Sequence, residues 1–368
     1  MPVPFNDLKA QLAPLDAELR AAFERVLGRG WFLSGPEVAA FEAEFAAWLG
    51  LAHAVSLNSG TDALALCLRA LDPAPGDEVV LPAHTAPPCY HAVLAAGCVP
   101  VFADVDPATG LLDPAAAAAA AGPRTRAVMA VHLYGLACDL DALAALCAER
   151  GLALVEDCAQ AHGATFQGKK VGTFGAMAAF SFYPTKNLGA LGDAGAAACA
   201  DPGLAERLVM LRQYGEKVRY QSDLAGANSR MDELQAAFLR ARLARLEQDT
   251  AERRALAAAY GEGLAGLPLA LPAAPAGREH VFHLYVVRTP QRDALAAFLK
   301  DKGIGTAVHY PIPGHLQPLF TSGQAPSRAG DMPHTERLCR EVLSLPFYPG
   351  MGRAAVDEAC AAVRGFFA

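Results

Sequence analysis

Hydrophobic residues recur along this chain with two periods that alternate. In residues 36–49, Val38, Phe41 and Phe45 fall at helical spacing, which predicts a helix with one buried face. Residues 126–135, RAVMAVHLYG, instead form a nearly continuous apolar run, which is typical of a strand buried on both faces of a parallel sheet. Comparable runs predict strands at 53–57, 78–83, 99–105, 152–160 and 178–183, and helical spacing predicts helices at 61–71 and 139–151. This alternation predicts an α/β fold with a mostly parallel sheet.

The pattern changes in the last third of the chain. Residues 231–260 predict one long helix with apolar and basic faces, and the proline-rich stretch 266–277 follows it. Beyond that stretch, a strand at 280–289, a helix at 292–303 and a strand at 304–313 predict a second, smaller α/β unit.

The length of the chain, 368 residues, also fits two domains. We expect residues 1–250 to form an N-terminal arm and a large domain. We expect residues 251–368 to form a small C-terminal domain.

Composition narrows the classes of partner. The chain is 53% hydrophobic and 19% charged, with a net charge of −7 and no basic run, which argues against nucleic acid as a partner. The sequence has no apolar run of about 18 residues, so we expect no membrane span. Nine cysteines without a C-x-x-C pair, and no secretory leader, favour a reduced, cytoplasmic protein. The histidines show no metal-binding spacing, so we expect no metal site.

One candidate ligand site is the stretch LNSGTDALAL, where a strand gives way to a helix. Gly60 allows close backbone approach, and the free N–H groups of a helix start suit a phosphate, with Ser59 nearby and Thr61 as the expected N-cap. The alternative is an ordinary capped turn between a strand and a helix.

A second and a third candidate follow two buried strands. Asp157 ends an apolar strand, where open α/β sheets bind ligands, and Gln160 follows it. Lys186 comes just after the aromatic run FSFYPT and before a glycine-rich stretch. The alternatives are a structural cap for Asp157 and a solvated loop position for Lys186.

Taken together, the candidates match the needs of one cofactor. Pyridoxal phosphate requires a lysine for its Schiff base, an acid that keeps the pyridine nitrogen protonated, and a cradle for its phosphate. Lys186, Asp157 and the turn at Ser59–Thr61 supply all three, and Ser181 could add a hydroxyl to the phosphate.

In the stretches around these candidate residues, and in others along the chain, the sequence resembles the DegT/DnrJ/EryC1/StrS family of sugar aminotransferases. The resemblance covers nearly the whole chain and implies a fold-type I pyridoxal phosphate enzyme, with a mostly parallel mixed sheet flanked by helices and a smaller C-terminal domain. The matching stretches are NSGTDAL, GDEVVLPAHT, VPVFADVDPATG, AVHLYG, VEDCAQAHGA, FSFYPTKNLGALGD, GANSRMDELQAAFL, HLYVVR and VHYPIPGH.

The resemblance implies a role for each matching cofactor residue. Lys186 would form the Schiff base and move protons, Asp157 would pair with the pyridine nitrogen, and Gln160 would contact the ring hydroxyl. The phosphate would be held by Gly60, Thr61 and Ser181, with Ser59 nearby. Asn228 would reach the phosphate of a neighbouring subunit, which implies a homodimer with shared active sites.

The substrate side matches the family less closely. His309, Tyr310 and His315 fall in a segment that resembles the sugar-nucleotide side of the family, although each could equally be a packing residue. Ala86 stands where the family has an aromatic residue that stacks on the cofactor, and we expect His84 to take its place. Three further departures are the pair Pro87–Pro88, Ala194 in the stretch GDAG, and Ala176.

We therefore expect an aminotransferase that passes through the pyridoxamine phosphate form. It would take an amino group from L-glutamate and deliver it to a keto group of a nucleotide-linked deoxyhexose. Tyr214, followed by Gly215, resembles relatives that act on 3-keto sugars, which favours a dTDP-linked 3-keto substrate, although Tyr214 could equally pack at a dimer interface. The alternatives are a 4-keto sugar nucleotide, a free cyclitol ketone, a sugar dehydratase, which Lys186 argues against, and a non-catalytic regulator.

Overall fold

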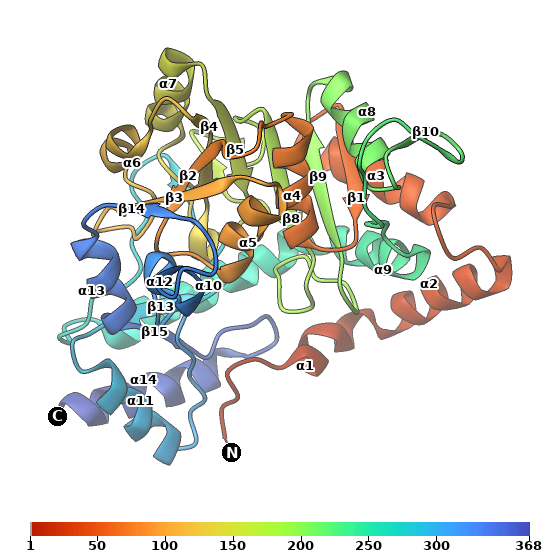
Figure 1. The fold of residues 1–368 in the computed structure, drawn as a ribbon. Helices are drawn as coiled ribbons and strands as arrows, with labels where there is room; N and C mark the ends of the chain where they lie inside the picture. The colour runs from red at the N-terminus through yellow and green to blue at the C-terminus, as the bar shows by residue number, and fades with distance from the viewer. Residues whose placement is uncertain (1) are drawn as a thin grey trace.

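The computed structural model describes residues 2–368 and is organised around one large mixed sheet (Figure 1). Its strand order is β1-β9-β8-β5-β4-β2-β3-β14. Neighbours from β8 to β14 run parallel, whereas β9 runs antiparallel to both β1 and β8. The bounds are β1 His53–Leu57, β2 Glu78–Pro82, β3 Val99–Ala103, β4 Thr125–Val131, β5 Ala153–Asp157, β8 Met177–Ser181, β9 Gly195–Cys199 and β14 Arg328–Ala329.

Helices flank this sheet, as the alternating pattern predicts. Helix α4 packs on β8 and β9, α7 packs on β4 and β5, and α3 packs against β1 and α9. Gly151 ends α7 in the left-handed conformation. The bounds are α3 Pro36–Leu49, α4 Gly60–Ala70, α5 Pro87–Ala95, α6 Pro114–Ala120, α7 Leu140–Arg150, α8 Pro202–Leu211 and α9 Glu233–Leu243.

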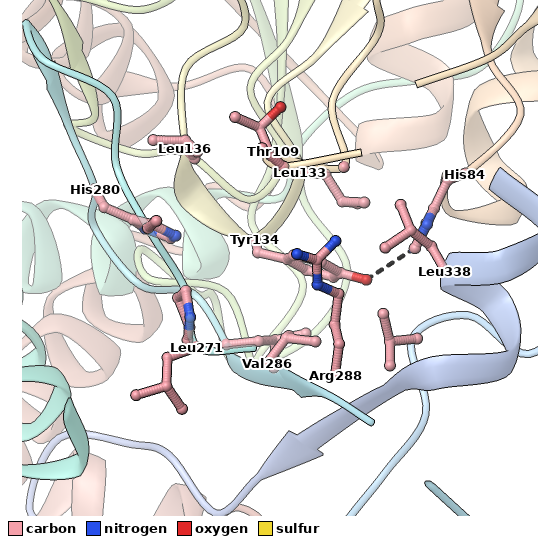
Figure 2. A pocket seen from close by; sticks show the side chains of 16 residues that line it. His84, Thr109, Leu133, Tyr134, Leu136, Leu271, His280, Val286, Arg288 and Leu338 are labelled. Carbon is pink, nitrogen blue, oxygen red and sulfur yellow. Dashed lines mark hydrogen bonds between the residues drawn. The ribbon is translucent and has the colours of Figure 1, made fainter. Parts of the chain in front are cut away.

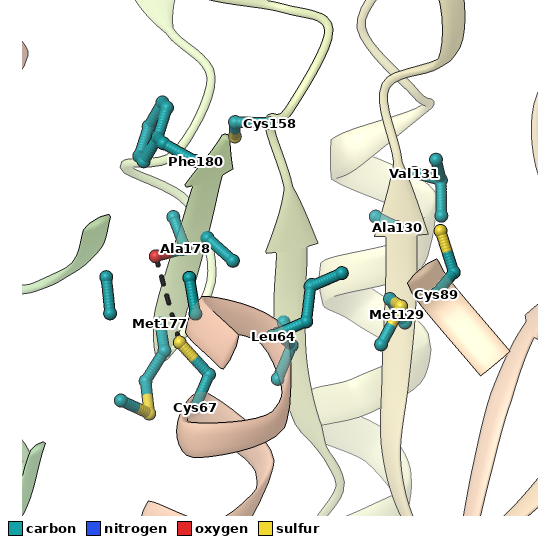
Figure 3. Packing of buried hydrophobic residues seen from close by; sticks show 14 of the residues in the cluster. Leu64, Cys67, Cys89, Met129, Ala130, Val131, Cys158, Met177, Ala178 and Phe180 are labelled. Atoms are coloured by element: carbon teal, nitrogen blue, oxygen red, sulfur yellow. Dashed lines mark hydrogen bonds between the residues drawn. The ribbon is translucent and has the colours of Figure 1, made fainter. Parts of the chain in front are cut away.

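Small side chains let α4 lie close to the sheet. Strands β8 and β9, on which α4 packs, are rich in alanine. The Cys67 thiol of α4 donates to the carbonyl oxygen of Ala178 in β8 at 3.8 Å (Figure 3). Leu64, on the same helix, is buried, and full burial of a leucine contributes about 2 kcal/mol. This packing fixes the N-terminus of α4 against the ends of the central strands.

The C-terminal part has a second core around a two-stranded antiparallel sheet, β13 Tyr285–Arg288 and β15 Val342–Leu345. Helices α10 Leu246–Leu264, α11 Arg292–Asp301 and α14 Arg353–Phe367 surround it. Val3, from the other end of the chain, is buried in this core and pairs with Ile304. The N-terminal arm and the C-terminal residues therefore share one core.

Two expectations about these elements are wrong, and one strand was missed. The helix expected over 231–260 is two helices, because α9 ends at Leu243 before α10 begins. The strand expected over 304–313 is replaced by isolated bridges, such as that of Ala307 with Ser344, because prolines in this stretch cannot donate to a ladder. The sequence pattern did not predict strand β9. The domain boundary expected at 250 falls inside α10 and stays a prediction.

The remaining elements are short or peripheral. Among residues 2–368, none of the helices combines the length and the apolar character that a membrane crossing requires. The remaining bounds are α1 Leu8–Leu12, α2 Asp16–Arg29, α12 Pro318–Thr321, α13 Pro333–Glu341, β6 Thr165–Phe166, β7 Lys169–Lys170, β10 Glu216–Val218, β11 Gln221–Ser222 and β12 Arg278–Glu279.

Candidate active site

A cavity of about 330 Å³ opens where β5 and β8 end and α4 begins. Ligands of open α/β sheets bind at this edge, outside the carboxyl ends of the strands. The structure brings seven of the eight expected cofactor residues to this cavity, and Asn228 lies outside it. The seven are Ser59, Gly60, Thr61, Asp157, Gln160, Ser181 and Lys186.

The first turn of α4 forms one wall of the cavity. Ser59 is the N-cap, and its hydroxyl oxygen accepts a hydrogen bond from the Asp62 N–H at 3.1 Å, so the expected cap at Thr61 is wrong. A Cβ atom at Gly60 would lie 2.4 Å from Cβ of Ser181. The glycine therefore lets the end of β8 touch the start of α4. Free N–H groups of this turn, beside the Ser181 hydroxyl, suit a phosphate.

Asp157 lies at the end of β5 and is almost fully buried. Its Oδ1 accepts from the Ala159 N–H at 3.0 Å, and its Oδ2 accepts from the Cys89 thiol at 3.0 Å. The Thr85 hydroxyl lies 2.8 Å from the same sulfur. Burial raises the pKa of the Cys89 thiol well above its usual value, so this thiol stays a neutral donor. The contacts hold the carboxylate in a fixed orientation.

Lys186 lines the same cavity as Asp157. Burial lowers the pKa of Lys186 to about 8, while the nearby Asp157 carboxylate opposes that shift. About one in ten of these amines is uncharged at pH 7, against about three in ten thousand for a solvated lysine. An uncharged amine is the nucleophilic form, so Lys186 is suited to attack a carbonyl.

Gln160 and Tyr310 close another side of the cavity. The Gln160 Oε1 accepts from the Tyr134 N–H at 2.7 Å, and its Nε2 donates to the Tyr310 hydroxyl at 3.2 Å. The Tyr134 hydroxyl donates to the carbonyl oxygen of His309. The imidazole of His309 points elsewhere, because its Nδ1 lies 2.8 Å from the Ser344 hydroxyl and its ring stacks on Phe5.

His84 lies outside the residues that line the large cavity. It lines a neighbouring, smaller cavity together with Tyr134 and Arg288, and its Nε2 lies 2.9 Å from the Tyr134 hydroxyl (Figure 2). Burial lowers the pKa of His84 to about 4, so the ring is neutral. Ala86 itself lines the large cavity with a methyl group. A role for His84 toward cofactor or substrate stays a prediction.

Three more expected residues lie away from this cavity. The Nε2 of His315 is 3.4 Å from a carboxylate oxygen of Glu336. Tyr214 is 47% exposed, and its ring lies 5.8 Å from the guanidinium carbon of Arg230. Asn228 is exposed on the same surface, where its neighbour Ser229 donates to the side chain of Asp62 in the first turn of α4. Their roles also stay predictions.

Sequence reasoning missed several cavity residues. Tyr183 and Asp193 line the cavity beside Lys186, and their places within FSFYPTKNLGALGD were the available signal. Cys89 also lines the cavity, and no local pattern in the sequence indicates its contact with Asp157. The pair Pro87–Pro88 starts α5, where helix N–H groups lack an internal acceptor, so the two missing donors cost little there.

Beside Asp157, a network of buried polar groups joins β4 and β5 to the following loop. The side chains of His132, Glu156 and Cys158 place one potential metal-ligand atom each within 4.8 Å of one another. The Nδ1 of His132 already accepts from the Cys138 N–H, and the Glu156 carboxylate accepts from His132 and from the N–H groups of Gly172, Phe174 and Gly175. This network holds the loop in place against β5.

Known proteins resemble the whole chain. Residues 14–364 match the model of the DegT/DnrJ/EryC1/StrS aminotransferase family. The chain is 50% identical over 363 residues to dTDP-3-amino-3,4,6-trideoxy-α-D-glucose transaminase of Streptomyces venezuelae, covering 98% of this chain and 95% of that protein. It is 44% identical over 362 residues to UDP-N-acetyl-3-dehydro-α-D-glucosamine 3-aminotransferase of Acidithiobacillus ferrooxidans, covering 98% and 97%.

A solved structure matches the fold closely. The crystal structure of S. venezuelae DesV in complex with a ketimine intermediate superposes with a TM-score of 0.95 at 49% identity, covering 99% of this chain and 98% of that one. The sheet order, the cavity at its edge and the full-length similarity agree. The chain belongs to the DegT/DnrJ/EryC1/StrS aminotransferase family and has the fold-type I architecture of that family.

Proposed function

We propose that this chain binds pyridoxal phosphate in the cavity and moves an amino group from L-glutamate to a nucleotide-linked keto sugar. The observation that carries the proposal is the meeting of Lys186, Asp157 and the first turn of α4 around one cavity. Similarity to named transaminases over the full length supports the same reaction.

The residues present fit the cofactor. Gly60 lets the end of β8 lie against the first turn of α4, and the hydroxyls of Ser181 and Thr61 then lie beside the free N–H groups of that turn. Asp157 has an acceptor for a protonated ring nitrogen, and Gln160 has donors for a ring oxygen. When bound, pyridoxal phosphate supplies an electron sink that lets an amino group leave one carbon and join another.

Lys186 supplies the proton transfers in this proposal. A group with a pKa of about 8 both gives and takes protons readily near neutral pH. Asp157 keeps a negative charge facing the amine, held by Ala159 and Cys89. Binding of the nucleotide outside the cavity would place the keto carbon of the sugar next to the amino group, and this positioning alone would favour the reaction.

For the substrate we propose a dTDP-linked 3-keto-6-deoxyhexose. The S. venezuelae relative is named for a dTDP-3-amino sugar, and the A. ferrooxidans relative is named for amination at carbon 3 of a UDP sugar. Both names agree on carbon 3, whereas they differ in the nucleotide. The pair Tyr214–Gly215 favours the same carbon. A 4-keto sugar nucleotide and a free cyclitol ketone are the competing substrates.

The test is direct amination of a panel. Purified protein charged with pyridoxamine phosphate is incubated with 3-keto and 4-keto dTDP-6-deoxyhexoses, a 3-keto UDP sugar and a cyclitol ketone. Mass spectrometry identifies which compound gains an amine, and NMR locates the amine. We expect the dTDP 3-keto sugar to react fastest. Amination at carbon 4 alone would refute the choice of carbon, and failure to bind pyridoxal phosphate would refute the enzyme.

We also propose that the chain works as a homodimer. Large apolar side chains are exposed on α2 and the loop after it, including Leu27 and Trp31, each 57% exposed, and Phe32 at 49%. Burying such a face is strongly favourable, so it suits contact with a second copy. Asn228, exposed close to α4, would then serve the partner's cavity.

The nine free, buried cysteines support a reducing cytoplasmic setting.

Mixing two inactive variants tests the shared site. Lys186→Ala and Asn228→Ala proteins are each expected to be inactive, and their mixture should recover part of the activity, because a hybrid dimer regains one intact site. Subunit exchange is checked by mass spectrometry of the intact dimers. Exchange without recovery would argue against a shared site.

A further inference from the structure

Residues 280–284 form one of the segments that join the two cores of this protein. This segment follows β12, which pairs with β6 beside the large sheet, and it leads into β13 of the small sheet. The segment includes His283, which is almost completely buried. Buried Arg253 holds the segment from α10, because its guanidinium donates to the carbonyl oxygens of Phe282 at 3.1 Å and of His283 at 3.3 Å.

The side chain of His283 reaches the residue that follows Lys186. The Asn187 side chain is buried, and its Nδ2 donates to the carbonyl oxygen of Val281 at 3.1 Å. This bond fixes the orientation of the amide, so its Oδ1 is the atom 3.1 Å from Nδ1 of His283. An amide oxygen is an acceptor, and Nδ1 of His283 therefore carries the hydrogen.

The backbone of His283 reaches the opposite side of the cavity. Its N–H donates to the carbonyl oxygen of Tyr134 at 2.8 Å, and the Tyr134 N–H donates to Oε1 of Gln160 at 2.7 Å. Gln160 and Lys186 both line the cavity. His283 is thus hydrogen-bonded to Asn187, which follows Lys186 in the sequence. It is also hydrogen-bonded to Tyr134, which in turn is hydrogen-bonded to Gln160.

We propose that His283 is a positioning residue that fixes Lys186 through Asn187 and Gln160 through Tyr134. The inference rests on the proposed function, in which Lys186 is the reactive amine. Burial lowers the pKa of His283 well below its usual value, and Lys186, Arg253, His309 and His162 lower it further, so the ring remains a neutral donor across the working pH range.

A shift in the properties of Lys186 distinguishes positioning from mere packing. The pKa of Lys186 is near 8 because this half-buried side chain is partly withdrawn from water. Losing the hydrogen bond between His283 and Asn187 would loosen the loop that carries Lys186 and let water reach its amine. The pKa of Lys186 would then move back toward 10.5. Loss of packing alone would lower stability and leave this pKa where it is.

The experiment labels Lys186 with an amine-reactive acylating reagent in protein without cofactor, over a pH series, and mass spectrometry quantifies the modified peptide. We expect the labelling midpoint of His283→Leu to rise by about one pH unit. His283→Asn places a donor close to the Nδ1 position and should restore the wild-type midpoint, whereas His283→Gln places it one bond too far and should not.

His280→Leu is the matched control, because His280 is a buried histidine of the same segment whose Nδ1 accepts from the Phe282 N–H. Its midpoint should stay at the wild-type value. Equal shifts for His280→Leu and His283→Leu, equal behaviour of His283→Asn and His283→Gln, or an unchanged midpoint in His283→Leu would each overturn the proposal. If His283→Leu does not fold, the comparison of His283→Asn with His283→Gln decides. The readout needs no bound cofactor, so failure of the proposed function would appear separately, as a lack of pyridoxal phosphate binding.

Discussion

Replacing Gly60 by alanine tests the proposed phosphate cradle. The new Cβ atom would lie 2.4 Å from Cβ and 2.8 Å from Cα of Ser181. Non-bonded carbons rest about 3.5–4.0 Å apart, so α4 and the end of β8 must separate by about 1 Å. Overpacking of this kind costs about 1–3 kcal/mol of stability. A displacement of about 1 Å in a binding group costs up to about 100-fold, so we expect pyridoxal phosphate to bind about 10–100-fold more weakly.

The measurement is a titration of Gly60→Ala protein with pyridoxal phosphate, followed by absorbance, together with urea unfolding. Gly261→Ala in α10 is the control, because a Cβ there meets nothing within 4 Å, and it should gain about 0.5–1 kcal/mol. Adding Ser181→Gly to Gly60→Ala removes the closest clash and should return part of the lost stability. Wild-type affinity in Gly60→Ala would refute the cradle.

Three further predictions concern charge and hydrogen bonding. Asp157→Asn removes the carboxylate that opposes the burial effect on Lys186, so the labelling midpoint of Lys186 should fall below about 8; a midpoint that rises would contradict this electrostatic account. Cys89→Ala removes the hydrogen bond from the thiol to Asp157 and should weaken pyridoxal phosphate binding several-fold in the same titration. Cys89→Ser keeps a donor and should bind the cofactor with an affinity close to that of the wild type. Equal affinities of the two variants would argue against a donor role for Cys89. Arg25 holds the pKa of Glu37 at about 2, so Glu37 should contribute about 1–2 kcal/mol to the free energy of unfolding above pH 4.5, and this contribution should be lost as the pH falls toward 2. In urea unfolding, Glu37→Gln should therefore be less stable than the wild type at pH 7 and equally stable near pH 2.

The sequence predicted the central strands well because they are buried on both faces. Continuous apolar runs such as 126–135 leave little choice between a strand and a loop. Strand β9, Gly195–Cys199, was missed because its residues are glycine, alanine and cysteine, which carry no strand preference. It is a strand because it lies between β1 and β8 in the sheet. Its side chains are small because larger ones would push α4 away from the sheet. That is a tertiary reason, which a local pattern cannot reveal.

The site divides in the same way. Lys186, Asp157 and the turn at Ser59–Thr61 were predictable because each lies at a strand end, where topology alone places a ligand. The contacts of Cys89 and His283 were not predictable, because they join segments far apart in sequence through side-chain geometry. The orientation of the His84 side chain shows the limit most clearly. The order of residues puts it near Ala86, while the backbone turns its ring toward Tyr134.

The pairing of Val3 with Ile304 has a consequence for how the molecule is made. During synthesis Val3 emerges long before its partner Ile304, so its position in the second core stays unfilled while the residues between them are translated. Domains generally fold as they emerge, and here the large sheet can assemble before the arm finds its place. Closing this long loop is slow relative to local pairing. Anchoring of the arm is therefore expected to be a final step of folding, and bulky fusions at the N-terminus should delay it.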